Sequence, residues 1–194
     1  MNWLIVAAFA GITLPFFTLW VIFNGLVRHR NTVRQSLSGI SVQLKRRADL
    51  IPNLVEVVRG YAQHEREVLQ QVTQLRDLAK SSAALLTNLS TAPALEHVGK
   101  SVDTVFVRLL AIAEAYPDLK ASANFLELQK QLEETENQIT AARRIYNSNV
   151  AGYNTATEQF PSNLVAKWSG FLPQSFFQED AAANTVPKVA MTAA

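Results

Sequence analysis

The feature that most constrains the fold is a stripe of apolar residues spaced alternately three and four positions apart. It runs from residue 37 to residue 79 and is interrupted by two charges, Arg47 and Glu65. This spacing is typical of the buried face of a coiled coil or helical bundle. The stripe consists of Leu37, Ile40, Leu44, Arg47, Ile51, Leu54, Val58, Tyr61, Glu65, Val68, Val72, Leu75 and Ala79. We therefore expect one long helix here that packs against other helices.

Two later segments repeat the same spacing and predict two more helices. The second helix covers about residues 94–115, and Pro117 ends it. The third covers about residues 122–160, and polar residues between 81 and 93 mark the connection to the first. No useful length of chain alternates with period two, and only 7 Gly and 7 Pro occur among 194 residues. The chain is therefore predicted to be all-α, with an antiparallel bundle of long helices over residues 25–177.

An uncharged segment, residues 2–23, precedes the bundle. At about 1.5 Å per residue it is long enough to cross a hydrocarbon core of roughly 30 Å. Trp3 and Trp20 lie near its ends, where aromatic side chains favour the membrane interface, and a transmembrane helix tolerates Pro15. We expect a retained transmembrane anchor over residues 1–24. A cleaved signal peptide, which lacks its usual basic start here, and a buried core helix are the alternatives.

Basic residues follow the uncharged segment but do not precede it. Arg28, Arg30 and Arg34 are the nearest, and the first acid is Asp49. The positive-inside rule then predicts a single-pass protein with its N-terminus outside and its body in the cytoplasm. Since these arginines adjoin a bilayer, we expect them to contact anionic lipid headgroups, and we expect no nucleic-acid partner.

The two charges in the apolar stripe need partners, because an unpaired buried charge is costly. Arg47 and Glu65 cannot pair with each other, since a continuous helix would separate them by about 27 Å. Their partners must come from another helix or another subunit. For Arg47 we expect an acid of the third helix, with Glu133 and Glu136 as candidates. Its neighbours Lys45 and Arg46 lie off the stripe and are expected to face water.

A proline interrupts the first helix and bears on how the bundle closes. Pro52 lacks an amide hydrogen and crowds the preceding turn, so the helix should kink or restart near residues 49–51. A helix continuous to about residue 80 would be far longer than the second helix. Part of its apolar stripe would then stay exposed in one subunit and drive homo-oligomerisation. The alternative is a sharp break at Pro52 that folds the chain into a compact, monomeric four-helix bundle.

The C-terminal segment, residues 160–177, holds more large apolar groups than a solvated tail would. Trp168, Phe171, Phe176 and Phe177 are the largest. The segment is expected to fold back onto the bundle, and the alternative is a docking edge for a partner subunit or the bilayer surface. Residues 178–194 are predicted to form a disordered, solvated tail.

Residues able to carry chemistry are sparse, and we expect no catalytic, cofactor-binding or metal-binding residues. Cysteine is absent. His64 and Glu65 begin a zinc-protease pattern, but position 68, where a second histidine is needed, is Val68. The acids Glu133, Glu134 and Glu136 are expected to form the polar side of a helix. The chain is thus predicted not to be an enzyme.

Several motifs, in order, resemble the LemA family of bacterial membrane proteins. They are VQLKRRADLIPNLVEVVRGYAQHE, YPDLK, NFLELQKQLEETENQITAARRIYN and YNTATEQFPSNLVAKWSGF, and the likeness extends over residues 24–177. The resemblance implies an N-terminal helix in the bacterial inner membrane, a cytoplasmic antiparallel helical bundle and no enzymatic activity. Some members are linked to membrane organisation, including magnetosome formation.

Two functions fit these features. The first is a membrane-anchored scaffold that self-assembles and organises or shapes the bacterial membrane. The alternative is an accessory or adaptor subunit that presents partners to a membrane enzyme or protease, with another membrane protein as its partner.

Overall fold

The computed structural model describes residues 2–63, 65–86, 89 and 91–177, and for residues 2 and 4–12 it describes the helix but not the side chains. Every regular element in this part of the chain is a helix, as predicted. The helices are α1 (Asn2–Tyr61), α2 (Arg66–Leu86), α3 (Ala92–Glu114), α4 (Pro117–Lys120), α5 (Ala123–Glu158) and α6 (Ser162–Ser169). The predicted tail, residues 178–194, lies outside the described residues.

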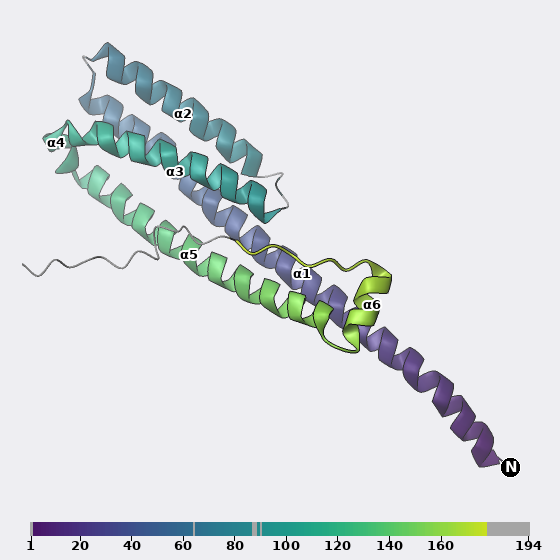
Figure 1. Cartoon of the computed structure of the whole chain (residues 1–194). Coiled ribbons are helices and arrows are strands. Elements are labelled where there is room, and N and C mark those ends of the chain that lie inside the picture. Colours follow the sequence, from purple (N-terminus) through teal and green to yellow (C-terminus); the bar gives the residue numbers. More distant parts are fainter. Residues whose placement is uncertain (1, 64, 87–88, 90, 178–194) are drawn as a thin grey trace, which may run out of the picture.

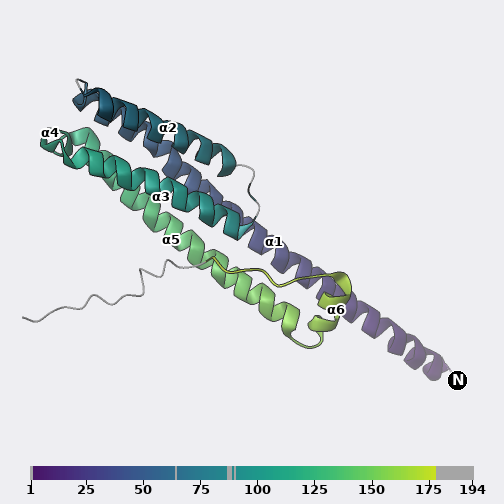
Figure 2. The same cartoon turned by 45° about the horizontal axis from the view of Figure 1, so that its top comes forward.

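Four long helices form an antiparallel bundle (Figure 1). The chain runs up α1, returns along α2, runs up α3 and returns along α5, while the one-turn α4 joins α3 to α5. The N-terminal part of α1 projects beyond the other helices in both views (Figure 2). The short α6 follows α5 and packs beside α1 where that projection begins. The predicted antiparallel bundle of long helices is confirmed.

The prediction of one helix from residue 37 to residue 79 is wrong, because the chain reverses between Tyr61 and Arg66. The turn is tight: the Ala62 amide donates to the Val58 carbonyl at 3.0 Å, and the Glu65 amide donates to the Ala62 carbonyl at 3.0 Å. Most residues in both halves of the apolar stripe are then buried within a single chain, whereas Tyr61 and Glu65, at the turn, are exposed. The spacing did not reveal the turn, because each helix of an antiparallel pair needs an apolar face of the same period. His64 lies outside the described residues.

Of the two outcomes expected at Pro52, a kink or a restart, the restart is wrong, because α1 continues through this residue and through Pro15. Pro52 removes one hydrogen bond of the helix, yet Ile51, Leu54 and Val55 beside it are each at most 1% exposed. Tertiary packing on both sides of the proline therefore holds the helix where the isolated sequence would break it.

The later helices follow the predicted ranges closely. α3 ends three residues before Pro117, and this proline then opens α4 rather than only closing α3. Ser122 caps α5, since its hydroxyl accepts a hydrogen bond from the Phe125 amide at 3.4 Å. The predicted connection from residue 81 is too long, because α2 continues to Leu86.

The core lies where α1 is surrounded by α2, α3 and α5. Ile40, Leu44, Leu95 and Leu109 are fully buried there. Gly99 of α3 faces Leu44 of α1, since a β-carbon at this position would lie 3.4 Å from the Leu44 side chain, which is an ordinary van der Waals contact. The core begins at Leu26, which is 1% exposed, and most of residues 13–23 of α1 lie outside it.

Within the described part of the chain, no helix has an apolar stretch long enough to cross a membrane. The transmembrane anchor at residues 1–24 therefore stays a prediction.

Candidate functional site

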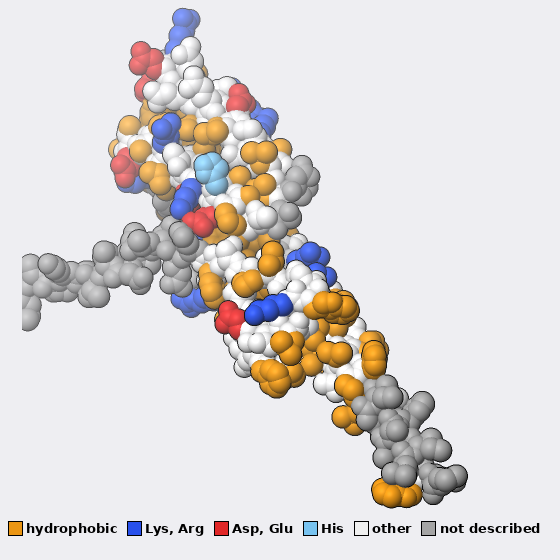
Figure 3. All heavy atoms as spheres, turned by 45° about the vertical axis from the view of Figure 1, so that its right-hand side comes forward, with side chains coloured by type: hydrophobic (Ala, Val, Ile, Leu, Met, Phe, Trp, Pro, Cys, Tyr) orange, Lys and Arg blue, Asp and Glu red, His pale blue; other side chains and the backbone are white. Residues whose placement is uncertain are grey.

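The most distinctive surface lies where the projecting part of α1 meets the bundle. Phe16 is 71% exposed, Trp20 63% and Phe23 41%, whereas Leu26 is 1% exposed. The exposure of these apolar side chains thus falls over about three helical turns as α1 enters the bundle. Apolar side chains are also visible on the surface at this end (Figure 3). A water-soluble protein rarely exposes so many neighbouring large apolar groups.

The helix α6 supplies the other side of this surface. Its Val165 and Ala166 are buried, while Leu164 is 59% exposed and Trp168 is 90% exposed. α6 ends at Gly170, whose positive φ of 72° favours glycine, and the Phe171 amide closes the turn on the Ala166 carbonyl at 2.9 Å. α6 therefore attaches to the bundle by one face and presents Trp168 outward.

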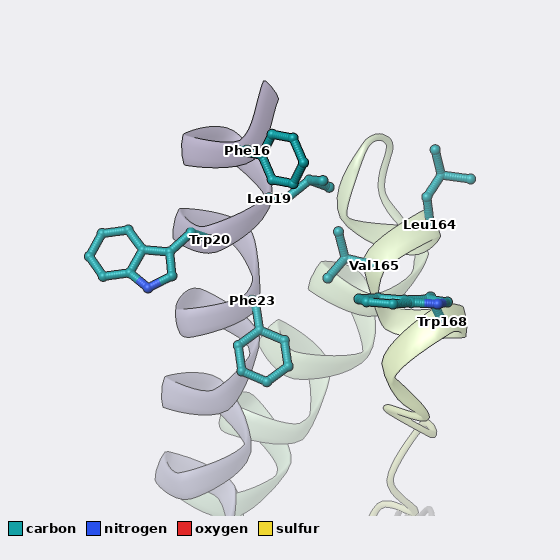
Figure 4. Close-up of a pocket in the computed structure, with 7 residues that line it drawn as sticks. All are labelled: Phe16, Leu19, Trp20, Phe23, Leu164, Val165 and Trp168. Carbon is teal, nitrogen blue, oxygen red and sulfur yellow. The ribbon is translucent and has the colours of Figure 1, made fainter. Parts of the chain in front are cut away.

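Between the two helices lies an open concavity of about 560 Å³, which we call the α1–α6 groove. Leu19 and Val165 point toward each other across it, and Trp20 points away from α6 (Figure 4). Every residue that lines the groove is apolar: Phe16, Leu19, Trp20, Phe23, Leu164, Val165 and Trp168. Its volume is within the usual range for small-molecule sites, roughly 300–1,000 Å³.

Basic side chains lie on the bundle side of the groove. Arg28 and Arg34 are exposed, whereas Arg30 is partly covered. The guanidinium of Arg30 lies 4.8 Å from the centre of the Phe171 ring, and that ring also packs edge-on against Phe23 at 5.7 Å. The structure therefore leaves two of the three predicted headgroup-contacting arginines open to solvent. The third also holds the C-terminal segment.

Residues 171–177, which we call the C-terminal strap, fold back along the bundle. Phe171 and Phe177 are buried, whereas Phe176 is 52% exposed. For these two buried rings the expected fold-back is confirmed, but Trp168, on α6, stays on the surface. The segment therefore packs on the bundle through Phe171 and Phe177 and leaves Trp168 exposed beside them, while a docking edge for a partner or a bilayer stays a prediction.

Two pairs of side chains on α5 hold the strap by its backbone. The side-chain amide of Asn147 donates to the Phe177 carbonyl and accepts from the Phe177 backbone N–H, at 3.0 and 2.8 Å. The side-chain amide of Asn154 makes the same two hydrogen bonds to Gln174, at 3.0 and 2.9 Å. The hydroxyls of Tyr146 and Tyr153 donate to backbone carbonyls of the strap, each at 3.0 Å.

The register of these contacts follows from simple geometry. Seven residues of helix rise about 10.5 Å, and three residues of extended chain span about 10 Å. A Tyr-Asn pair repeated after seven residues on α5 therefore matches backbone groups three residues apart on the strap. The repeat at residues 146–147 and 153–154 is visible in the sequence, but our prediction did not use it.

Arg47 lies between three helices, with its side chain 16% exposed. One nitrogen, Nη1, contacts the carboxylates of Asp103 on α3 at 2.6 Å and Glu136 on α5 at 2.7 Å. The guanidinium also lies 5.3 Å from the centre of the Phe106 ring. The expected partnership with Glu136 is present, Asp103 was missed, and Glu133 is exposed.

The expectation that Glu65 occupies a buried stripe is wrong. Glu65 lies in the turn between α1 and α2 and is exposed. It hydrogen-bonds to Tyr116, and partial burial, together with this hydrogen bond and the nearby negative charge, raises the pKa of the Tyr116 hydroxyl. Burial likewise raises the pKa of Tyr146, and it raises that of Tyr153 against the opposing charges of Arg30 and Arg34.

No group of three or more His, Asp or Glu side chains that could hold a metal ion occurs among the described residues. Glu133, Glu134 and Glu136 lie on α5 as expected, and Glu136 is engaged with Arg47. The α1–α6 groove, whose lining residues are all apolar, is suited to binding an apolar group.

Comparison with known proteins identifies a family and several relatives of this chain. The sequence model described as the LemA family matches residues 36–191. Protein LemA of Metamycoplasma hominis is 28% identical over 158 residues, which cover 80% of this chain and 68% of that protein. Magnetosome protein MamQ 2 of Paramagnetospirillum magneticum is 25% identical, and Magnetosome protein MamQ of Magnetospirillum gryphiswaldense is 24% identical. Both of these alignments span 187 residues and cover 87% of this chain and 69% of the relative.

Proposed function

This chain belongs to the LemA family, and on that premise we propose that it is a membrane-anchored, non-enzymatic scaffold. Its N-terminal residues 1–24 enter the bilayer, and its bundle self-assembles and organises or shapes the bacterial membrane. Two of the relatives are named magnetosome proteins. That likeness, together with the link to membrane organisation that the family resemblance implies, supports an organising role.

The observation that carries the proposal is the apolar extension of α1 beyond the bundle. Its residues 13–23 contain no charge and leave large side chains such as Phe16 and Trp20 facing outward. The long helices that cover α1 from Leu26 onward do not extend along this stretch (Figure 2). A bilayer would solvate these side chains, and the uncharged residues 2–23 match roughly 30 Å of hydrocarbon.

The arginines that follow the extension support an orientation. With Arg28, Arg30 and Arg34 on the cytoplasmic side, the chain crosses the inner membrane once, and its bundle lies in the cytoplasm. The test uses full-length protein tagged at either terminus, in cells with a permeable outer membrane and a sealed inner membrane. External protease should remove the N-terminal tag and spare the C-terminal tag. Cleavage of the C-terminal tag would overturn the orientation, and release of the protein by alkaline carbonate would overturn the anchor.

The observation that supports self-assembly in the structure differs from the one that supported it in the sequence. Since α2 folds back and covers the apolar stripe, unequal helix lengths no longer argue for association. Apolar side chains remain exposed on the bundle, however, including Val42 at 59%. Val42 lines a concavity between α1 and the end of α2 together with Leu86 and Leu89. Tethering to a membrane raises the local concentration and favours contacts between copies.

A further inference from the structure

We propose that the α1–α6 groove binds lipid, with an acyl chain between the two helices and anionic headgroups at the basic residues beside it. The helix α6 then forms a second membrane contact, separate from the anchor. This inference rests on the proposed insertion of α1, and it specifies what that insertion brings into contact with the bundle.

The composition of the groove fits a hydrocarbon chain better than a polar ligand. All of its lining residues are apolar, and they come from both α1 and α6. Its α1 side is continuous with the exposed residues 13–23, so a bilayer that surrounds this stretch also reaches the mouth of the groove. Lipid is thus the occupant that the position of the groove favours.

The orientation of α6 supports the same occupant. Val165 and Ala166 are buried and attach α6 to the bundle. Leu164 and Trp168 are exposed and line the groove. Trp168 is the most exposed large apolar side chain among the described residues, at 90%. Tryptophan favours the headgroup boundary of a bilayer, because it combines a large apolar ring with a polar N–H group.

The charges around the groove favour anionic headgroups. In the sequence, residues 2–48 contain no acid, and residues 137–177 contain one, Glu158. The exposed bases nearest the groove along the chain are Arg28 on α1 and Lys167 on α6. Cations beside an apolar surface attract the anionic lipids of a cytoplasmic leaflet.

The test measures the depth of single tryptophans in full-length protein reconstituted into vesicles. The chain has 3 tryptophans, so Trp3→Phe with Trp20→Phe leaves Trp168 as the reporter, and Trp3→Phe with Trp168→Phe leaves Trp20. The vesicles contain phosphatidylcholine and phosphatidylglycerol, with bromine atoms on the acyl chains as quenchers. Brominated chains should remove roughly half of the Trp168 emission, because an interfacial ring lies against the upper acyl chains.

A matched control places a tryptophan at the far end of α1. Tyr61 is exposed there, and Tyr61→Trp in a chain without the natural tryptophans should show no quenching by the brominated lipid. If Trp20 is quenched but Trp168 is not, the anchor stands and the inference about α6 is wrong. If neither is quenched, the proposed insertion itself fails. If neither brominated lipid nor aqueous acrylamide quenches the emission of Trp168, protein covers this side chain, and that result would also overturn lipid binding.

The proposed preference for anionic headgroups is tested by a separate measurement. Bromine on phosphatidylglycerol chains should quench Trp168 more than the same amount of bromine on phosphatidylcholine chains. Arg28→Gln with Lys167→Gln should remove that difference, whereas the exposed Arg46→Gln, on the bundle, should leave it unchanged. Equal quenching by both lipids in the unaltered chain would overturn the preference for anionic headgroups.

Discussion

At the scale of single residues, one cation joins three helices. Arg47 extends from α1 and contacts Asp103 of α3 and Glu136 of α5 through the same nitrogen. Both acids keep part of their side chains in solvent, 34% for Asp103 and 47% for Glu136. The group is therefore neither a fully buried ion pair nor a surface pair. Its contribution to the free energy of unfolding should lie between the values for those two kinds of pair.

We predict that Arg47→Met lowers the stability of the bundle by about 1–3 kcal/mol, because it leaves two carboxylates together without their cation. For a chain of this size the melting temperature should fall by roughly 3–10 °C. Thermal unfolding followed by circular dichroism measures the change. Arg46→Met is the matched control, since Arg46 is exposed and makes no ion pair within the described part of the chain. Equal melting temperatures for the two variants would contradict the role given to Arg47.

A second residue-scale prediction concerns the tyrosines that hold the strap. Burial raises the pKa of Tyr146 and of Tyr153 above 10.0, so folding favours their neutral hydroxyls. Their contribution is fully present below about pH 10 and is lost as the pH rises through the raised pKa values. Melting temperature should therefore decline more steeply above pH 10 in the natural chain than in Tyr146→Phe with Tyr153→Phe. The exposed Tyr61→Phe should leave the decline unchanged, and identical curves for all three chains would refute the prediction.

At the scale of elements, the strap shows how a segment without regular structure acquires a fixed register. Its backbone groups pair with side chains of α5, because two asparagine amides present both a donor and an acceptor to the extended chain. Phe171 and Phe177 then anchor its two ends in the core. The strap and Gly170 together set the position of α6 beside α1, and so they build one wall of the α1–α6 groove.

We predict that Asn147→Ala with Asn154→Ala opens the strap without unfolding the bundle. Each variant removes two hydrogen bonds that are partly solvated, and together they should cost about 1–2 kcal/mol of local stability. Hydrogen exchange at the amides of Gln174 and Phe177 should accelerate by about tenfold. Asn137→Ala, an exposed position on the same helix, is the control. Unchanged exchange at both amides would show that the aromatic anchors alone hold the strap.

At the scale of the whole molecule, the bundle and the projecting helix have different surfaces. The bundle buries its apolar stripe within one chain, whereas α1 leaves residues 13–23 outside it. One copy is therefore complete as a folded unit and still presents apolar groups for further contacts. The proposed anchor and the α1–α6 groove share residues of this stretch, whereas the concavity at Val42 lies on the bundle, so contacts between copies at Val42 can be altered separately from both.

The whole-molecule prediction is that full-length protein in mild detergent is larger than one chain of 21.5 kDa. Val42→Asp should shift it toward single chains, because a charge in the concavity between α1 and α2 would lose its hydration on association. Val107→Asp is the control, since Val107 is 67% exposed on α3. Mass photometry across micromolar concentrations measures the distribution. A single chain at every concentration would contradict self-assembly, and stoichiometric recovery of a different protein would favour the adaptor alternative.

The sequence by itself determined the helical class of the fold and two of the four long helices of the bundle. Spacing of apolar residues predicted α3 and α5 within a few residues, because local hydrophobic period is a property of each helix alone. It also predicted that Arg47 needs an acid from α5, because a charge in an apolar stripe restricts its partners. The resemblance to the LemA family, carried by motifs in the same order, proved correct.

Only the tertiary structure decided where the chain turns and what the end of the chain does. The reversal at residues 62–65 leaves the hydrophobic period unbroken, so no local pattern distinguishes it from a continuous helix. Pro52 stays helical because residues distant in sequence pack around it. Asp103 meets Arg47, and Phe171 meets Arg30, through contacts between segments far apart in the chain. Such contacts depend on how helices pair in space, which local periodicity does not encode.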